Sequence, residues 1–195
     1  MFRTFQRFLV VLVLGCLILP ASGAEEEEDE PGLKDRLFFG GNFGFSFGST
    51  TSIIVSPLAG IYITPRLSSG LGIRYEYYKS NYPGIVAFDT HIYGGSVFTR
   101  YMIFKNMAET FGVGELGTGM FLQGEYEVLS LESRYFDHSY TDPGDRFLLH
   151  SVLAGGGIYQ PIGKRAGLLL TVLWNLNESY RSIYSNPIIR LGFTF

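Results

Sequence analysis

The stretch NPIIRLGFTF, residues 186–195, alternates between apolar and mixed side chains up to its last residue. Successive side chains of an extended strand point to opposite faces. One face of this strand is wholly apolar and carries Ile189, Leu191, Phe193 and Phe195, whereas the other face carries Arg190. Chain ends are usually polar and frayed. A terminal residue that completes an apolar face therefore predicts that the last strand is part of the fold.

The same alternation recurs along the chain, and no stretch of the mature chain keeps the spacing of an amphipathic helix for long. About 160 residues follow residue 33, which suits a single domain. We predict eight strands in this part of the chain, at residues 37–48, 51–63, 67–79, 89–104, 120–131, 146–160, 166–176 and 187–195.

Most of these segments have one apolar face and one face of small or charged residues. In segment 67–79, for example, Leu71, Ile73 and Tyr75 lie opposite Arg74 and Glu76. The second segment is less regular, and the sixth, FLLHSVLAGGGIYQ, has no orientation that its sequence decides. The pattern predicts an all-β, eight-stranded antiparallel up-and-down barrel.

Two barrel types fit such faces. A soluble, lipocalin-like ligand-binding barrel turns its apolar faces inward, whereas a transmembrane barrel turns them toward lipid and fills its lumen with polar groups. The polar faces here are mostly Gly, Ser and Asn with charges of both signs, and small residues suit a crowded interior. The composition favours the transmembrane barrel with a filled polar lumen.

The connections between segments support this choice. Short turns at 64–66 and 161–164 alternate with long polar links at 80–88, 132–145 and 177–186, as in outer-membrane barrels with short periplasmic turns. Two connections depart from the rule. The hairpin at 48–51 is tight although it belongs to the long side, and 105–119 is long although it belongs to the periplasmic side.

The N-terminal region predicts export. Arg3 and Arg7 precede an apolar run at 8–19 and then small residues, which indicates a signal peptide over residues 1–24, cleaved after Gly23 or Ala24. Cys16 lies in VLGC, a partial match to the bacterial lipid-attachment box. The apolar run continues past Cys16, which favours a residue that is removed with the signal peptide.

An acidic run, EEEEDE at 25–30, opens a flexible leader that we predict over residues 25–36, ahead of a barrel domain at 37–195. Six adjacent acids lack the spaced ligands of a defined metal loop. Basic and acidic residues nearly balance in the rest of the mature chain, so nucleic acid is not an expected partner. The stretch GVGELG at 112–117 matches the G-x-G-x-x-G fingerprint of dinucleotide-binding proteins, but an alternating segment follows it and not a helix. We therefore expect no cofactor, and we also expect no metal.

The signal peptide, the eight alternating segments and the terminal Phe195 together resemble the small eight-stranded outer-membrane β-barrel proteins of bacteria. The phrases THIYGG (90–95), GGGIYQPIGKR (155–165) and YSNPIIRLGFTF (184–195) further resemble an uncharacterised outer-membrane barrel family. The resemblance implies location in the bacterial outer membrane and contact with its lipids. It also implies that the barrel assembly machinery reads the last strand, with Ile189, Leu191, Phe193 and Phe195 as its signal.

The expected lumen collects three positive and three negative side chains: Arg74, Arg100 and Arg190 with Glu76, Glu125 and Glu127. An eight-stranded barrel is just wide enough for its own side chains, and arginine and carboxylate groups satisfy one another when buried. We predict that these residues form a packed ionic plug. A proton or ion path is the alternative function of the same residues.

His91, His138 and His150 are the candidates for catalysis by a Ser, His and acid site near the outer leaflet. His138 lies in a polar loop with Asp137 and Ser139, and His150 and Ser151 point apart because they are neighbours on a strand. We therefore expect that the protein is not an enzyme.

We predict a sealed outer-membrane protein with a structural, adhesive or surface-recognition role through its outer loops. The alternatives are a lipid-modifying outer-membrane enzyme and a soluble, lipocalin-like ligand-binding barrel.

Overall fold

The structure is a computed structural model of the 195-residue chain, and it describes residues 32–46, 50–80, 88–112, 117–133, 145–163, 166–177 and 182–195. All of these residues belong to one compact unit, Gly32–Phe195. The predicted signal peptide with Cys16, the acidic run at 25–30 and His138 lie outside the described residues.

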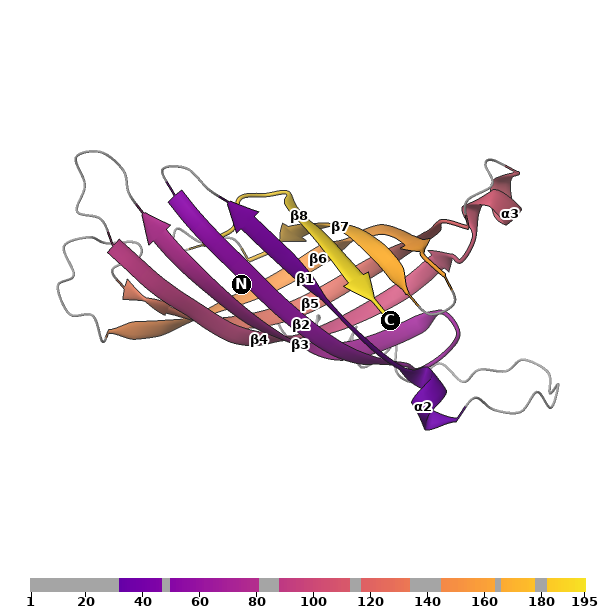
Figure 1. Ribbon diagram of the computed structural model, residues 1–195, viewed down its shortest axis with the longest axis horizontal. Coiled ribbons are helices and arrows are strands. Elements are labelled where there is room, and N and C mark those ends of the chain that lie inside the picture. The colour runs from indigo at the N-terminus through magenta and orange to yellow at the C-terminus, as the bar shows by residue number, and fades with distance from the viewer. Residues whose placement is uncertain are drawn as a thin grey trace, which may run out of the picture. The chain divides into compact units, whose positions relative to one another are not determined.

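Eight strands form a closed barrel in which each strand pairs antiparallel with the next, and the eighth pairs with the first (Figure 1). The predicted eight-stranded antiparallel up-and-down barrel is confirmed, and each strand boundary lies within two residues of its expected place. The strands are β1 (Leu37–Ser46), β2 (Thr50–Tyr62), β3 (Leu67–Ser80), β4 (Phe88–Phe104), β5 (Gly119–Glu132), β6 (Arg146–Pro161), β7 (Gly167–Asn175) and β8 (Ile188–Thr194).

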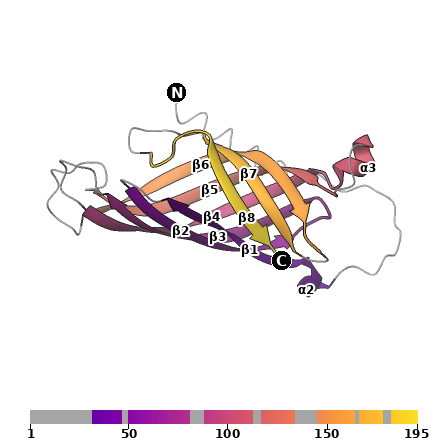
Figure 2. The ribbon, with the colours of Figure 1, turned by 45° about the horizontal axis from the view of Figure 1, so that its top comes forward.

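The terminal residue closes the barrel. Figure 2 shows β8 between β7 and β1, and β8 pairs with β1 through Gly40–Thr194 to Asn42–Gly192. One residue further, Phe39 and Phe195 exchange backbone hydrogen bonds of 3.0 and 2.8 Å, so Phe195 extends the ladder past the end of β8. The opening stretch of the sequence therefore supplies the seam of the barrel up to its last residue.

The two ends of the barrel differ. At one end, called the turn end, β2, β4 and β6 end and β3, β5 and β7 begin. At the opposite loop end, β1, β3, β5 and β7 end and β2, β4, β6 and β8 begin. Two short helices, α2 (Leu33–Arg36) and α3 (Met107–Phe111), lie at the turn end (Figure 1). The long connection anticipated at 105–119 therefore contains helix α3. No helix in the described part of the chain is long and apolar enough to span a membrane.

The apolar faces point outward, as the transmembrane alternative requires. In β3, Leu71, Ile73 and Tyr75 are exposed while Arg74 and Glu76 are buried. A β-bulge between Met102 and Phe104 interrupts the alternation of β4 near its C-terminal end. The soluble, lipocalin-like alternative is therefore wrong in its central requirement, because its apolar faces would have to fill the barrel.

Strand β6, which the sequence left unoriented, turns Ser151 and Leu153 inward and His150 outward. The neighbouring strand β7 also directs leucines inward, at Leu169 and Leu173. Strand β6 contains consecutive apolar residues, so period-two alternation cannot distinguish its two faces. In β7, Thr171 and Asn175 mark the inward face.

The interior is only partly polar, which corrects the expected polar lumen. An apolar cluster of Ile92, Leu129 and Leu131, with Phe147, Leu149 and Ile183 packed against it, lies toward the loop end. Phe38, Phe98, Phe121 and Leu169 are buried toward the turn end. Gly60 lies beneath the Phe38 ring, which leaves no room for a side chain at that position. The charged groups occupy the layer between these two apolar layers.

Candidate functional site

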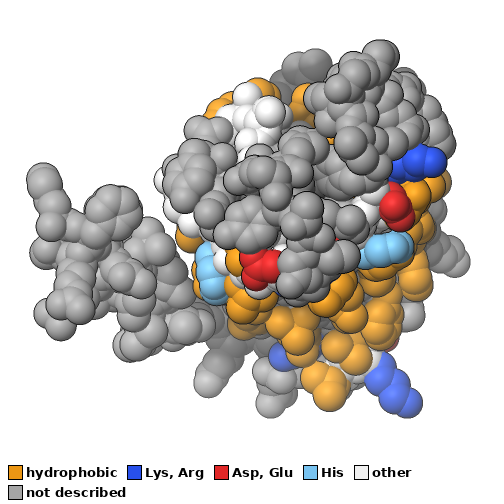
Figure 3. All heavy atoms as spheres, turned by 90° about the vertical axis from the view of Figure 1, so that its left-hand side faces the viewer, with side chains coloured by type: hydrophobic (Ala, Val, Ile, Leu, Met, Phe, Trp, Pro, Cys, Tyr) orange, Lys and Arg blue, Asp and Glu red, His pale blue; other side chains and the backbone are white. Residues whose placement is uncertain are grey.

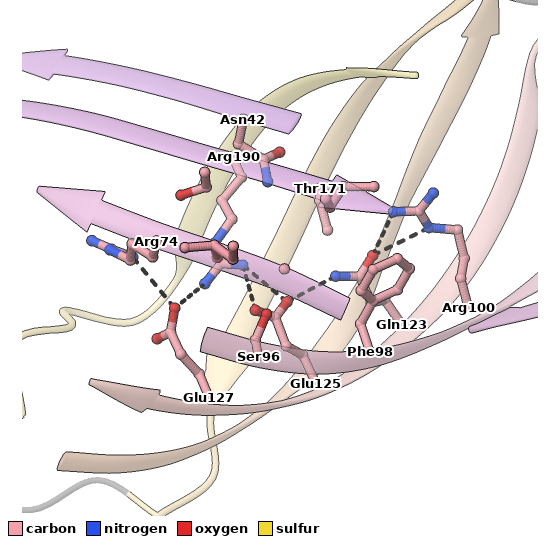
Figure 4. A pocket seen from close by; sticks show the side chains of 14 residues that line it. Asn42, Arg74, Ser96, Phe98, Arg100, Gln123, Glu125, Glu127, Thr171 and Arg190 are labelled. Carbon is pink, nitrogen blue, oxygen red and sulfur yellow. Dashed lines mark hydrogen bonds and ion pairs between the residues drawn. The ribbon is translucent and has the colours of Figure 1, made fainter. Parts of the chain in front are cut away.

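Three strands that are far apart in the sequence bring the predicted lumen charges together. Alternation directs Arg74 and Glu76 of β3, Glu125 and Glu127 of β5 and Arg190 of β8 into the barrel. Figure 4 shows Arg74, Glu125, Glu127 and Arg190. Arg74 and Arg100 are each 8% exposed, and Glu127 is 2% exposed. A charge buried to this extent requires an opposite charge and hydrogen bonds close by.

Arg190 and Glu127 link the two sides of this layer. Arg190 Nη1 donates to both carboxylate oxygens of Glu125 at 2.9 Å, and its Nη2 lies 3.8 Å from Glu127 Oε1. The same Glu127 oxygen lies 3.8 Å from Arg74 Nη1. Glu127 is therefore positioned between two guanidinium groups, and Figure 4 draws the resulting chain of interactions.

Arg74 continues the chain on β3. Its Nη2 donates to Glu76 Oε2 at 2.7 Å, and Ser52 of β2 donates to the other Glu76 oxygen at 2.8 Å. Each charge-assisted bond of this kind is shorter and stronger than a neutral one. The chain of interactions thus connects β2, β3, β5 and β8 across the barrel.

Arg100 differs from the expected plug because no described carboxylate forms an ion pair with it. Its Nε and Nη2 donate instead to the Gln123 side-chain oxygen at 3.2 and 3.0 Å, and Gln123 donates to Glu125 at 3.0 Å. The Arg100 guanidinium also lies over the rings of Phe98 and Phe121, at 5.4 and 4.7 Å from their centroids. Gln123 occupies the position between the Arg100 cation and the nearest carboxylate.

The connection between β7 and β8 supplies two interior residues that the alternation argument missed. Tyr184 accepts a 2.8 Å hydrogen bond from Arg74 Nη1 and donates a short one to Glu127. Burial raises the pKa of the Tyr184 hydroxyl above its ordinary value, so this group keeps the proton that it donates. Ile183 packs against the apolar cluster. An aromatic and an aliphatic residue side by side in a polar link, SIYSNP, are the signal that points to them.

The space left among these side chains is small. The cavity that Arg74, Arg100, Glu125 and Arg190 line has a volume of about 30 Å³. A single ordered water needs roughly 10–15 Å³ by such a measure. The layer therefore has room for one or two waters and none for a larger solute.

Tyr184→Phe tests the link from the connection to the charged layer. We expect the free energy of unfolding to fall by about 1–3 kcal/mol, because Arg74 and Glu127 each lose a buried hydrogen-bond partner while the ring remains. Thermal unfolding in detergent measures the change. Tyr77→Phe is the matched control, since no described group hydrogen-bonds to its hydroxyl, and a surface change of this kind stays within about 0.5 kcal/mol. Equal melting temperatures for the two variants would contradict the role of Tyr184.

The two described histidines face outward, away from the charged layer. His91 Nδ1 lies 2.8 Å from the Tyr75 hydroxyl, and His150 Nδ1 lies 2.8 Å from the Tyr126 hydroxyl. Ser151 points into the barrel, so His150 and Ser151 point apart as expected. Across the described ranges, no group of three His, Cys, Asp or Glu side chains is arranged to hold a metal ion.

The last strand has the expected faces. Ile189, Leu191 and Phe195 are exposed on its outer face, and the Phe193 ring stacks on the Phe43 and Phe195 rings at 5.7 and 6.0 Å. Recognition of this strand by the assembly machinery stays a prediction.

Comparison with known proteins gives little. No family model matches the chain, and no curated protein matches it. A similar solved structure is the crystal structure of the N-terminal β-barrel domain of Pseudomonas aeruginosa OprF. It is 10% identical, with a TM-score of 0.44 over 82% of this chain and 94% of that chain. A likeness at this level adds no support to the fold, which rests on the strand pairing.

Proposed function

We propose that the protein is an integral outer-membrane barrel with a sealed lumen, which acts through its presence in the bilayer and through its outer loops. The observation that carries the proposal is the inverted distribution of side chains. Apolar groups cover the outer wall of the barrel, and the charged groups are paired in its interior. This arrangement is stable in hydrocarbon and unfavourable in water.

The outer wall carries an apolar belt far larger than the patches that soluble monomers tolerate. Figure 3 views the loop end and shows hydrophobic side chains gathered on the flank below it. Phe45 is 76% exposed and Ile189 is 67% exposed. Other exposed members of the belt are Phe39, Phe43, Ile53, Val55, Leu71, Ile73, Val97, Leu122, Leu168, Leu170, Trp174 and Leu191.

Charged residues mark the edges of the belt. Lys79, Asp89 and Arg146 lie at the loop end, and Arg66 and Lys105 lie at the turn end. Between these edges, no charged side chain among the described strand residues points outward. The Ser69 hydroxyl on the wall donates to the Phe98 carbonyl at 2.8 Å.

The ends of the barrel suggest its orientation. Outer-membrane barrels have short periplasmic turns and longer extracellular loops, so the turn end with both barrel termini faces the periplasm in this proposal. The loop end then faces outward. The sealed interior supports a structural, adhesive or recognition role over transport of solutes.

Membrane fractionation with gel mobility tests the proposal. We expect the protein in the outer-membrane fraction, extracted by detergent but not by salt or alkaline buffer. An unboiled sample should migrate differently from a boiled one, because a closed barrel resists unfolding by the gel detergent. A maltose-binding periplasmic protein and a known porin serve as fractionation controls. Recovery of the protein in buffer without detergent would overturn the proposal.

A further inference from the structure

A hollow of about 240 Å³ opens at the turn end of the barrel. It is larger than the cavity of the charged layer and shares only Arg100 with it. Three cationic side chains line it, those of Arg66, Arg100 and Lys105. No carboxylate is found among its described lining residues. The described lining of the hollow is therefore positively charged, and its low-dielectric walls concentrate the local field.

Arg100 is the buried cation of this hollow. Its guanidinium uses Nε and Nη2 on Gln123, and its Nη1 has no hydrogen-bond partner among the described residues. The side chain is 8% exposed, and Phe98 and Phe121 hold its guanidinium between the charged layer and the hollow. This Nη1 group is free to donate to a ligand, and a hydrogen bond from a guanidinium to an anion is stronger than a neutral one.

Hydroxyl groups complete the lining. The side chains of Tyr62, Ser68 and Tyr159 face the hollow, and their hydroxyls make no hydrogen bond to any residue in the described part of the chain. The Tyr62 ring is held by Phe38, with the ring centroids 4.9 Å apart. Fixed cations and free hydroxyl donors around one small space are the groups that recognise an oxyanion.

We propose that this hollow binds a small molecule with an oxyanion group, either a carboxylate or a phosphate monoester, attached to a small apolar or aromatic part. Arg100 and the hydroxyls would receive the oxyanion, and the Tyr62 and Tyr159 rings would contact the apolar part. The volume lies slightly below the range of about 300–1,000 Å³ for drug-sized ligands, so the ligand is small. If the turn end faces the periplasm, the ligand enters from there.

Phenyl phosphate has the required chemistry and is the probe. Calorimetric titration of the detergent-purified barrel should show saturable binding, with inorganic phosphate as a competitor. The uncharged analogue phenol should bind at least tenfold more weakly. Arg66→Ala/Lys105→Ala should weaken binding of phenyl phosphate tenfold or more, because two of the three lining cations are lost.

The matched control is Lys34→Ala/Lys79→Ala, which changes the net charge equally at two exposed residues that do not line the hollow. This control should bind phenyl phosphate as the unchanged protein does. Equal affinities of the two double variants, or no saturable binding, would overturn the proposal. The assay needs a folded barrel in detergent and does not depend on where the protein resides in the cell. Its failure is therefore distinguishable from failure of the membrane assignment.

Arg100→Met tests the buried cation directly and keeps an apolar stem of similar length. A variant that keeps its heat-modifiable mobility yet loses binding tenfold or more supports the proposal, whereas retained affinity contradicts it. Should Arg100→Met fail to fold, the exposed Arg66 and Lys105 pair still decides the question.

Discussion

Glu125→Gln/Glu127→Gln is expected to lower the melting temperature in detergent strongly and to cost at least about 3 kcal/mol of stability. Removing one partner of a buried ion pair typically costs about 3–5 kcal/mol, because the remaining charge is left buried without compensation. Here both carboxylates beside Arg190 are lost together, and among the described carboxylates Arg74 keeps only Glu76 as an ion-pair partner. Circular dichroism melting, with unboiled gel mobility as a second readout, measures the change.

The matched control for this double variant is Glu109→Gln, the same chemical change at an exposed residue of α3. Its melting temperature should stay within the error of the unchanged protein. Adding Arg190→Gln to Glu125→Gln should recover part of the loss from Glu125→Gln alone, with a coupling of about 1–3 kcal/mol. An unchanged melting curve for Glu125→Gln/Glu127→Gln would mean that the ionic layer does not stabilise the barrel.

Leu191→Arg is expected to destabilise the barrel in lipid vesicles by about 2–4 kcal/mol, because it places a charge on a lipid-facing strand near the middle of the hydrocarbon. Leu191 is 60% exposed and pairs in register with Leu170, another exposed member of the belt. In water the same change replaces one exposed side chain with another and costs within about 0.5 kcal/mol. Urea titration of the vesicle-inserted barrel measures the difference.

Ile63→Arg is the matched control for Leu191→Arg. Ile63 is also exposed, but it lies past the end of β2 at the turn end, where an arginine reaches the interface and costs about 0–1 kcal/mol. A large loss for Leu191→Arg with a small loss for Ile63→Arg identifies the outer wall as lipid-facing. Small and equal losses would show that the wall faces water.

The barrel, its strand boundaries and the outward face of most strands were predictable from alternation alone. The prediction succeeded where one face is apolar and the other small or charged, as in β3 around Arg74 and Glu76. A one-residue shift would have moved every such residue to the other face. Alternation counted backward from Phe195 also places Arg190 inside the barrel.

The prediction was incomplete where this contrast is missing. Strand β6 contains adjacent leucines, so the inward position of Leu153 had no signal in the pattern. The pattern also gave no signal for the contribution of Tyr184, because a connection between strands has no periodicity. The position of Tyr184 depends on its partners in β3 and β5. Alternation likewise assigns Gln123 to the interior but not to the place between Arg100 and Glu125.

The strands are of unequal length around the circumference, with 17 residues in β4 and only seven in β8. A tilted strand needs about 9–11 residues to cross the hydrocarbon core. Counted in paired residues, β8 is therefore shorter than a full crossing and β4 is longer. Thinning of the neighbouring leaflet or leaning of the cylinder relieves such a mismatch, each at fractions of a kcal/mol per ångström. In a membrane, the side of β8 then becomes the place where lipids are most deformed.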